Sequence, residues 1–163
     1  MVSIEEIQAA YYMVAATGVL IAAVFYIINM KTTIETRQAQ LFMQLYDRWT
    51  FDIGEKFWNF LDTDIKSAEE YFDRLKKDKE YSRNASILSR YHEGVGVLVR
   101  FGLLDIKYIA YLACWPTRMY WEKYKPIIAD IRRIQGAPRS DSESEYLYNR
   151  LIQYLEQHPE LKT

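Results

Sequence analysis

The first part of the chain is apolar, and the rest alternates apolar and polar positions. Residues 7–30 form a run of twenty-four positions without a charged side chain, and Lys31 ends the run. At about 1.5 Å of rise per residue, some twenty apolar residues cross the ~30 Å hydrocarbon core of a bilayer as one helix. The pattern predicts an N-terminal transmembrane helix over residues 7–30, with residues 1–6 as a short segment outside the membrane core.

Two other structures share such an apolar pattern. A core helix of a soluble protein is rarely this long without a charge. A cleavable signal peptide has a basic N-terminal region and a shorter apolar core of about 7–15 residues. Here Glu5 and Glu6 precede the run, and Tyr26 near its far end suits a membrane interface. A membrane anchor is therefore the favoured interpretation.

The charges beside the run predict its orientation. Basic residues accumulate on the cytoplasmic side of a span. Lys31, Arg37 and Arg48 follow the run, whereas Glu5 and Glu6 precede it. The N-terminus is expected outside and residues 31–163 in the cytoplasm, so the predicted location is the cell membrane, crossed once.

Two small residues within the span suggest a contact there. Gly18 and Ala22 lie four positions apart, and this spacing lets two transmembrane helices approach closely. We take Gly18 and Ala22 as candidate interface residues.

Beyond the span, apolar residues recur at helical spacing, and no period-2 pattern is long enough for a strand. Residues 31–50 predict a helical stalk, which either continues the span or restarts at a capping box of Thr32 and Glu35. Residues 51–163 predict a compact helical domain. The predicted fold is all-α, one N-terminal transmembrane helix continuing into a helical-bundle body.

Polar residues mark the expected starts of helices in the body. The expected N-terminal caps are Ser67 with Glu70, Asn84, Asp105, and Ser142 with Glu145.

Three residues inside the predicted helices are unusual there. Pro126 lies inside an apolar stripe and removes one backbone hydrogen bond, so we expect a kink or a break there. Gly94 and Gly96 fall inside a helix, where each costs about 1 kcal/mol relative to Ala, and we expect both to lie against another helix.

Charge and cysteine content exclude several classes. All 21 Lys and Arg and 20 of the 22 acidic residues lie after Met30, so the body carries a formal charge of +1. A nearly neutral body lacks the basic surface of a nucleic-acid-binding protein. Cys114 is the one cysteine, so neither an intrachain disulfide nor a thiolate cluster can form.

The sequence offers little for catalysis or for a cofactor, and none is predicted. Only two histidines occur, and no Glu-x-x-His pair suits a carboxylate-bridged metal site. We interpret His92 as a packing residue and His158 as solvated. Gly94-Val-Gly96 lies within a predicted helix rather than between a strand and a helix, which argues against a nucleotide loop.

Aromatic residues are abundant, with 14 Tyr, 7 Phe and 4 Trp. Most should form the core, and some could serve a partner surface, since Tyr and Trp are enriched at interfaces. Those that lie off the main apolar stripes are expected to be exposed. These candidate interface residues are Trp58, Tyr108, Trp121 and Tyr148.

Three segments carry a resemblance that covers most of residues 31–155. They are 36–46 (TRQAQLFMQLY), 93–106 (EGVGVLVRFGLLDI) and 121–128 (WEKYKPII). In this order they resemble an uncharacterised family of small archaeal and bacterial proteins with one N-terminal transmembrane helix and a helical domain of unknown function. The resemblance implies a membrane-anchored helical body and brings no activity, cofactor or catalytic residue.

These patterns favour a non-catalytic, membrane-anchored protein that acts by association. It would be an accessory subunit of a membrane complex or a homo-oligomeric scaffold, with the lipid bilayer and other subunits, or itself, as partners and no nucleic acid. The alternative is a membrane-tethered regulator that senses a cytosolic ligand or protein, which a pocket of aromatic and convergent polar groups would favour. An enzyme is a third class, favoured by a cleft that holds Glu93 with another buried carboxylate.

Overall fold

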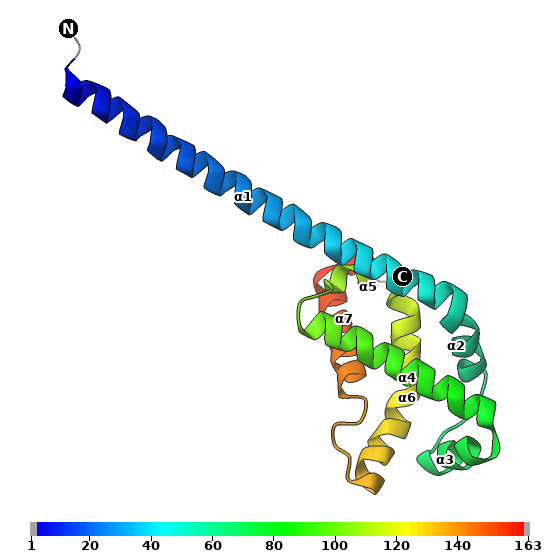
Figure 1. Ribbon diagram of the computed structural model, residues 1–163. Coiled ribbons are helices and arrows are strands. Elements are labelled where there is room, and N and C mark those ends of the chain that lie inside the picture. Colours follow the sequence, from blue (N-terminus) through cyan, green and yellow to red (C-terminus); the bar gives the residue numbers. More distant parts are fainter. Residues whose placement is uncertain (1–2, 162–163) are drawn as a thin grey trace. The chain divides into compact units, whose positions relative to one another are not determined.

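The computed structural model describes residues 3–161, and within this range the chain is helical with no strand (Figure 1). The predicted all-α fold is confirmed. Helix α1 (Ile4–Arg48) continues without interruption through the predicted span and into the stalk, so no helix restarts at Thr32. Residues 1–2 of the predicted N-terminal segment lie outside the described residues. By its contacts the chain divides into two units, Met1–Gln40 and Leu41–Thr163.

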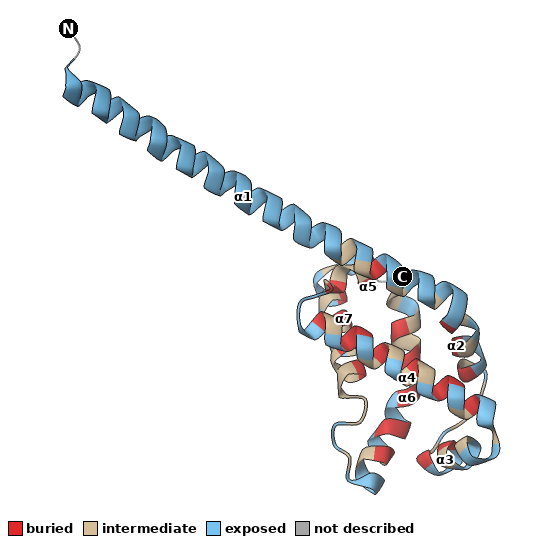
Figure 2. Cartoon of the chain, in the orientation of Figure 1, coloured by how far each residue is buried: buried red, intermediate tan, exposed pale blue. Residues whose placement is uncertain are grey.

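The first unit consists of α1 up to Gln40. Its start is a capping box, in which the Ser3 hydroxyl accepts from the Glu6 amide at 3.2 Å and a Glu6 carboxylate oxygen accepts from the Ser3 amide at 2.8 Å. The apolar side chains of this unit are exposed, as its pale blue colour in Figure 2 shows. By length and composition such a helix fits a membrane span or a signal sequence, and it is not a buried core helix within this chain.

The second unit, called the body here, begins with the last residues of α1 and a single π-helical turn. Helix α4 contacts α2, α3 and α7 (Figure 1). The division between the two units after Gln40 assigns residues 41–50, the last part of the predicted stalk, to the body. The elements are η1 (Trp49–Ile53), α2 (Gly54–Leu61), α3 (Ala68–Lys77), α4 (Lys79–Arg100), α5 (Ile106–Leu112), α6 (Cys114–Gln135), α7 (Ser142–Gln157) and the 3-10 turn η2 (Pro159–Leu161).

The body has two hydrophobic clusters, and α4 contributes to both (Figure 2). In the first, Leu88 of α4 packs with Phe57 of α2 and with apolar residues of α3 and α6. In the second, Val95 of α4 packs with Ile109 of α5 and Leu151 of α7. Leu88 and Leu151 are fully buried, and truncating such a leucine to Ala typically costs about 2–5 kcal/mol. The two clusters thus join every helix of the body through α4.

Local signals set several helix ends as the sequence predicts. The Ser67 hydroxyl accepts from the Glu70 amide at 3.2 Å and caps α3, and an Asp105 carboxylate oxygen accepts from the Lys107 amide at 2.9 Å and caps α5. Gly136 ends α6 with φ at 61°, a left-handed conformation that costs glycine little. The predicted caps at Ser67 and Asp105 are confirmed.

Two predicted caps are wrong. Helix α4 begins at Lys79 rather than at Asn84, because an Asp78 carboxylate oxygen accepts from the Tyr81 amide at 2.9 Å and starts the helix earlier. The Ser142 side chain does not cap α7, because a carboxylate from another helix takes the amides at that end. A short-range pattern cannot reveal such a distant acceptor.

Pro126 does not break α6, which is one helix over its 22 residues. The residues that follow it, Ile127 and Ile128, are buried in the first cluster, and this packing opposes a break.

The expectation that Gly94 and Gly96 both lie against another helix is half right. A methyl group added at Gly96 would lie 2.1 Å from the Glu143 carbonyl oxygen, whereas one added at Gly94 would meet nothing within 4 Å. Only Gly96 lies against another helix.

Candidate interaction surface

Large apolar side chains gather on the surface of the body where α2 meets the start of α6. The Trp58 and Trp115 rings lie 5.3 Å apart between centroids, with 53% and 48% of their areas exposed. Tyr111 and Leu112, at the end of α5, are also exposed and lie with Trp115 around one groove. We call Trp58, Tyr111, Leu112 and Trp115 the aromatic patch.

The groove beside the aromatic patch has a volume of about 330 Å³. Its apolar wall comes from the patch, and Arg118 of α6 and Glu160 of η2 add one charge of each sign. Arg118 also pairs with Glu122 one turn further along α6, at 3.4 Å. An apolar surface with a few charges at its edge is the usual composition of a protein–protein interface.

Of the four aromatic residues predicted to be exposed, Trp58 fits best. Tyr108 is half-buried, because its ring stacks on Phe42 with centroids 5.5 Å apart. Tyr148 is also half-buried, and its hydroxyl donates to a Glu122 carboxylate oxygen at 3.3 Å.

The expectation that Trp121 is exposed is wrong, because only 2% of its surface is accessible. Helix α6 contacts four other helices, α2, α3, α5 and α7, so more than one of its faces is covered. Both Trp121 and its neighbour Tyr120 therefore lie in the first cluster. A prediction that assumes one buried apolar stripe per helix therefore underestimates how much of the α6 surface is buried.

Gly18 and Ala22 lie in α1 and are exposed, and nothing lies within 4 Å of a methyl group added at Gly18. Their role as a contact within the span stays a prediction.

Three members of the aromatic patch escaped the sequence reasoning. On α5 the inward positions are Ile106, Ile109 and Ala110, so the helical period places Tyr111 and Leu112 outside. That signal was present in the sequence. For Trp115 it was not, because the exposure of the first turn of α6 depends on where α2 packs.

His92 lies deep in the body. Its ring stacks on Tyr120 with centroids 3.8 Å apart and planes within 1°, and its Nδ1–H donates to the Leu88 carbonyl oxygen at 2.9 Å. Burial is the main cause that lowers the pKa of His92 to about 4, whereas the hydrogen bond to Leu88 raises it by a smaller amount. A neutral, enclosed imidazole with 3% exposure agrees with the predicted packing role.

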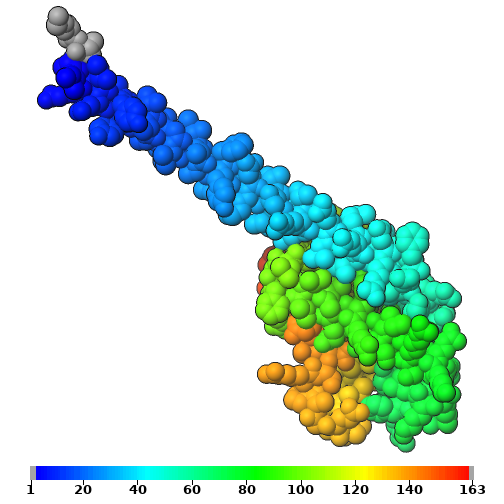
Figure 3. All heavy atoms as spheres, in the orientation of Figure 1, coloured from blue at the N-terminus to red at the C-terminus, as the bar shows by residue number. Residues whose placement is uncertain are grey.

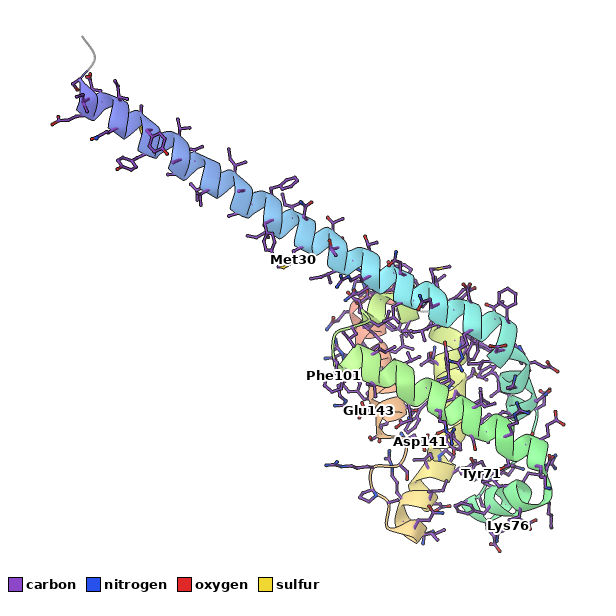
Figure 4. The ribbon with its side chains drawn as sticks, in the orientation of Figure 1. Met30, Tyr71, Lys76, Phe101, Asp141 and Glu143 are labelled. Atoms are coloured by element: carbon purple, nitrogen blue, oxygen red, sulfur yellow. The ribbon has the colours of Figure 1, made fainter. Side chains whose placement is uncertain are left out.

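Glu93 and Asp141 bring two carboxyl groups to the junction between α4 and α7, the setting that would favour an enzyme. Figure 4 shows Asp141 and Glu143 near the start of α7, beside α4. One Glu93 oxygen accepts from the Glu143 and Ser144 amides at 2.9 and 2.7 Å, and an Asp141 oxygen accepts from the Ser89 hydroxyl at 2.7 Å. Burial raises the pKa of both carboxyl groups.

The geometry of this junction is that of a helix cap supplied by a neighbouring helix. A carboxylate at the N-terminus of α7 satisfies amides that have no partner inside the helix and interacts favourably with the helix dipole. Gly96, one turn along α4 from Glu93, allows the close approach that brings the carboxylate to the amides. Figure 3 shows α4, in green, with α7, in orange, against it. Glu93 therefore has a structural use that explains its burial.

Other candidate chemistry is sparse. Across residues 3–161, no group of three or more His, Cys, Asp or Glu side chains is placed to hold a metal ion. Cys114 is half-buried, and burial raises the pKa of its thiol, which favours the unreactive thiol form.

A protein-family model identifies the family of this chain. A model of the domain of unknown function DUF4760 matches residues 13–151. The chain belongs to the DUF4760 family. The match includes most of α1 together with the body up to Leu151, so the long apolar helix and the helical body are parts of one family domain. No curated protein and no solved structure matches this DUF4760 chain.

Proposed function

We propose that this DUF4760 protein is a non-catalytic, membrane-anchored helical module that acts by protein–protein association. In this proposal α1 spans the cell membrane once, and the body lies in the cytoplasm. The partner is another subunit of a membrane complex or a second copy of the chain. The observation that carries the proposal is the aromatic patch, with two neighbouring tryptophans about half exposed.

Exposing large aromatic side chains to water is costly. Burying one aromatic residue removes on the order of 150–250 Å² from water. Tryptophan and tyrosine are also the residues that most often dominate binding energy at the centre of an interface. The ring contact between Trp58 and Trp115 fixes both side chains in advance, which reduces the entropy lost on binding. A partner's apolar side chain would enter the groove beside Trp115.

Charges on α1 support the membrane part of the proposal. Acidic Glu5 and Glu6 lie in its first turn, and the first basic residue, Lys31, follows the apolar segment. The Thr17 hydroxyl in that segment donates to the Met13 carbonyl oxygen at 2.8 Å, so it is satisfied inside the helix, as lipid requires. Gly18 and Ala22 would supply a second contact within the bilayer.

The test is co-purification of the full-length protein from native membranes in mild detergent, followed by mass spectrometry. Trp58→Ala combined with Trp115→Ala should weaken the recovered association more than tenfold, because truncating a central aromatic residue costs about 2 kcal/mol or more. The matched control is Ile134→Ala, an exposed apolar residue at the opposite end of α6. If the double variant recovers its partner as well as the parent does, the patch is not the interface. If the parent recovers no partner and stays monomeric, the association proposal fails.

A further inference from the structure

A second surface feature lies away from the aromatic patch, where α2 ends and α3 meets α4. A pocket of about 120 Å³ opens there, lined by Asn59, Arg74, Asp78, Glu80, Tyr81 and Asn84. We call it the Asn84 pocket. Its volume equals that of about four water molecules at ~30 Å³ each, which suits a molecule of roughly five to seven non-hydrogen atoms.

Asn84 gives the pocket its most informative group. Its residue is 9% exposed, yet its side-chain amide makes no hydrogen bond to a residue of the described range 3–161 and lines the pocket. A primary amide has two N–H donors and a carbonyl acceptor, and in the pocket these groups are open to a ligand. A bound polar molecule in the pocket would supply the missing partners.

The charged walls of the pocket limit the chemistry of that molecule. Asp78 is already engaged, because its carboxylate accepts from the Tyr81 amide at 2.9 Å and pairs with Arg74 at 3.1 Å. The hydrogen bond from the Tyr81 amide and, to a smaller extent, the nearby Arg74 charge lower the pKa of Asp78. Both therefore favour the charged carboxylate. Arg74 has five N–H donors, and Asp78 uses only part of them. Glu80 is exposed and forms no ion pair within the described part of the chain.

One pocket thus offers free guanidinium and amide donors together with a free carboxylate. A carboxylate ligand is matched by guanidinium and amide N–H groups, and an ammonium ligand by a carboxylate. We infer that the Asn84 pocket binds a small zwitterion of the amino-acid class, with its carboxylate on Arg74 and Asn84 and its ammonium group on Glu80. The volume of the pocket matches amino acids with short side chains, such as glycine, alanine and serine.

This site would give the body a ligand-sensing role that is independent of the aromatic patch. The ligand would join α3 to α4, since Arg74 belongs to α3 whereas Asn84 and Glu80 belong to α4. Anything that binds only the folded arrangement stabilises it, so occupancy would hold these two helices together. Ligand binding in this pocket would not depend on association of the body with a partner.

The experiment uses the full-length protein in mild detergent and isothermal titration with glycine, alanine and serine as probes. Saturable binding of these three is expected. Propionate, which lacks the ammonium group, and ethylamine, which lacks the carboxylate, should each bind at least about tenfold more weakly, because each loses one set of charge-assisted bonds. Tryptophan should not bind, since its side chain exceeds the pocket.

The decisive variant is Arg74→Gln, at an exposed position where the fold should tolerate the change. It should weaken alanine binding by about tenfold or more, with an unchanged circular dichroism spectrum. Arg83→Gln, an exposed arginine of α4 outside the pocket, is the matched control and should bind like the parent. Several results would overturn the inference: no saturable binding of any probe, equal binding of ethylamine or propionate, equal binding of tryptophan, or full binding by the Arg74 variant.

Discussion

Lowering the pH should destabilise the body through His92. Burial is the main cause that lowers the pKa of this imidazole from 6.5 to about 4 in the folded protein. In the unfolded chain the ring is solvated, and its pKa stays near 6.5. Between the two values the unfolded state binds a proton that the folded state does not bind. The free energy of unfolding therefore falls as the pH falls through this window, and the His92 contribution is fully present only above about pH 6.5.

The magnitude follows from the two pKa values. With about 4 in the folded state and about 6.5 in the unfolded state, the linkage relation gives a loss of about 2 kcal/mol between pH 7.5 and pH 5. The loss reaches about 3 kcal/mol at pH 4. Domains of this size are stable by about 5–15 kcal/mol, so the effect is large enough to measure.

The assay is urea unfolding of the full-length protein in mild detergent, followed by tryptophan fluorescence at pH 7.5 and pH 5. Trp49 reports on the site directly, because its ring centroid lies 6.1 Å from that of His92. The perturbation is His92→Phe, which keeps an aromatic ring against Tyr120 and removes the titratable group. Compared with the parent, this variant should lose about 2 kcal/mol less stability between the two pH values.

Glu93 and Asp141 also titrate in acid, and their raised pKa values act in the opposite direction to that of His92. Both are present in the parent and in the variant, so the difference between the two proteins isolates His92. Equal pH dependence in the parent and in His92→Phe would refute the reasoning, because it would mean that the buried ring does not set the proton balance.

Two further predictions concern packing and topology. Gly96→Ala should destabilise the body by about 1–3 kcal/mol, because the new methyl group would meet the Glu143 carbonyl oxygen. Gly94→Ala, at an exposed helix position, should instead stabilise the body by about 0.5–1 kcal/mol. Urea unfolding measures both free energies, and equal effects of the two substitutions would contradict the α4–α7 contact. A reporter that fluoresces only in the cytoplasm, fused after residue 163, should be bright in intact cells; a stable but dark fusion would reverse the proposed orientation.

Local patterns in the sequence determined the long apolar helix and most helices of the body. The run of uncharged residues is a property of consecutive side chains, and so is the 3.6-residue period that predicts buried positions. Caps within one turn were equally readable. Ser67 and Glu70 lie three positions apart, and the predicted contact between the Ser67 hydroxyl and the Glu70 amide forms as expected. Such contacts need no information about the rest of the fold.

The tertiary structure decided which faces are covered. Trp58 and Trp121 look alike in sequence, each a tryptophan beside an apolar stripe. One is exposed and the other buried, because α6 packs against α2, α3, α5 and α7, and the ring centroid of Trp121 lies 6.4 Å from that of Tyr148 on α7. The number of neighbours around a helix depends on chain segments far away in sequence, and periodicity carries no record of it.

The same limit explains the start of α7 and the polar pocket. A capping box was expected from Ser142 and Glu145, yet the amides are taken by Glu93, about fifty positions earlier in the chain. Asn84, expected as a cap, instead lies inside α4 with its amide in a pocket formed by three helices. A side chain's polarity is fixed by the sequence, but the partner that satisfies it is fixed by helix packing, since only packing brings distant donors and acceptors within hydrogen-bonding distance.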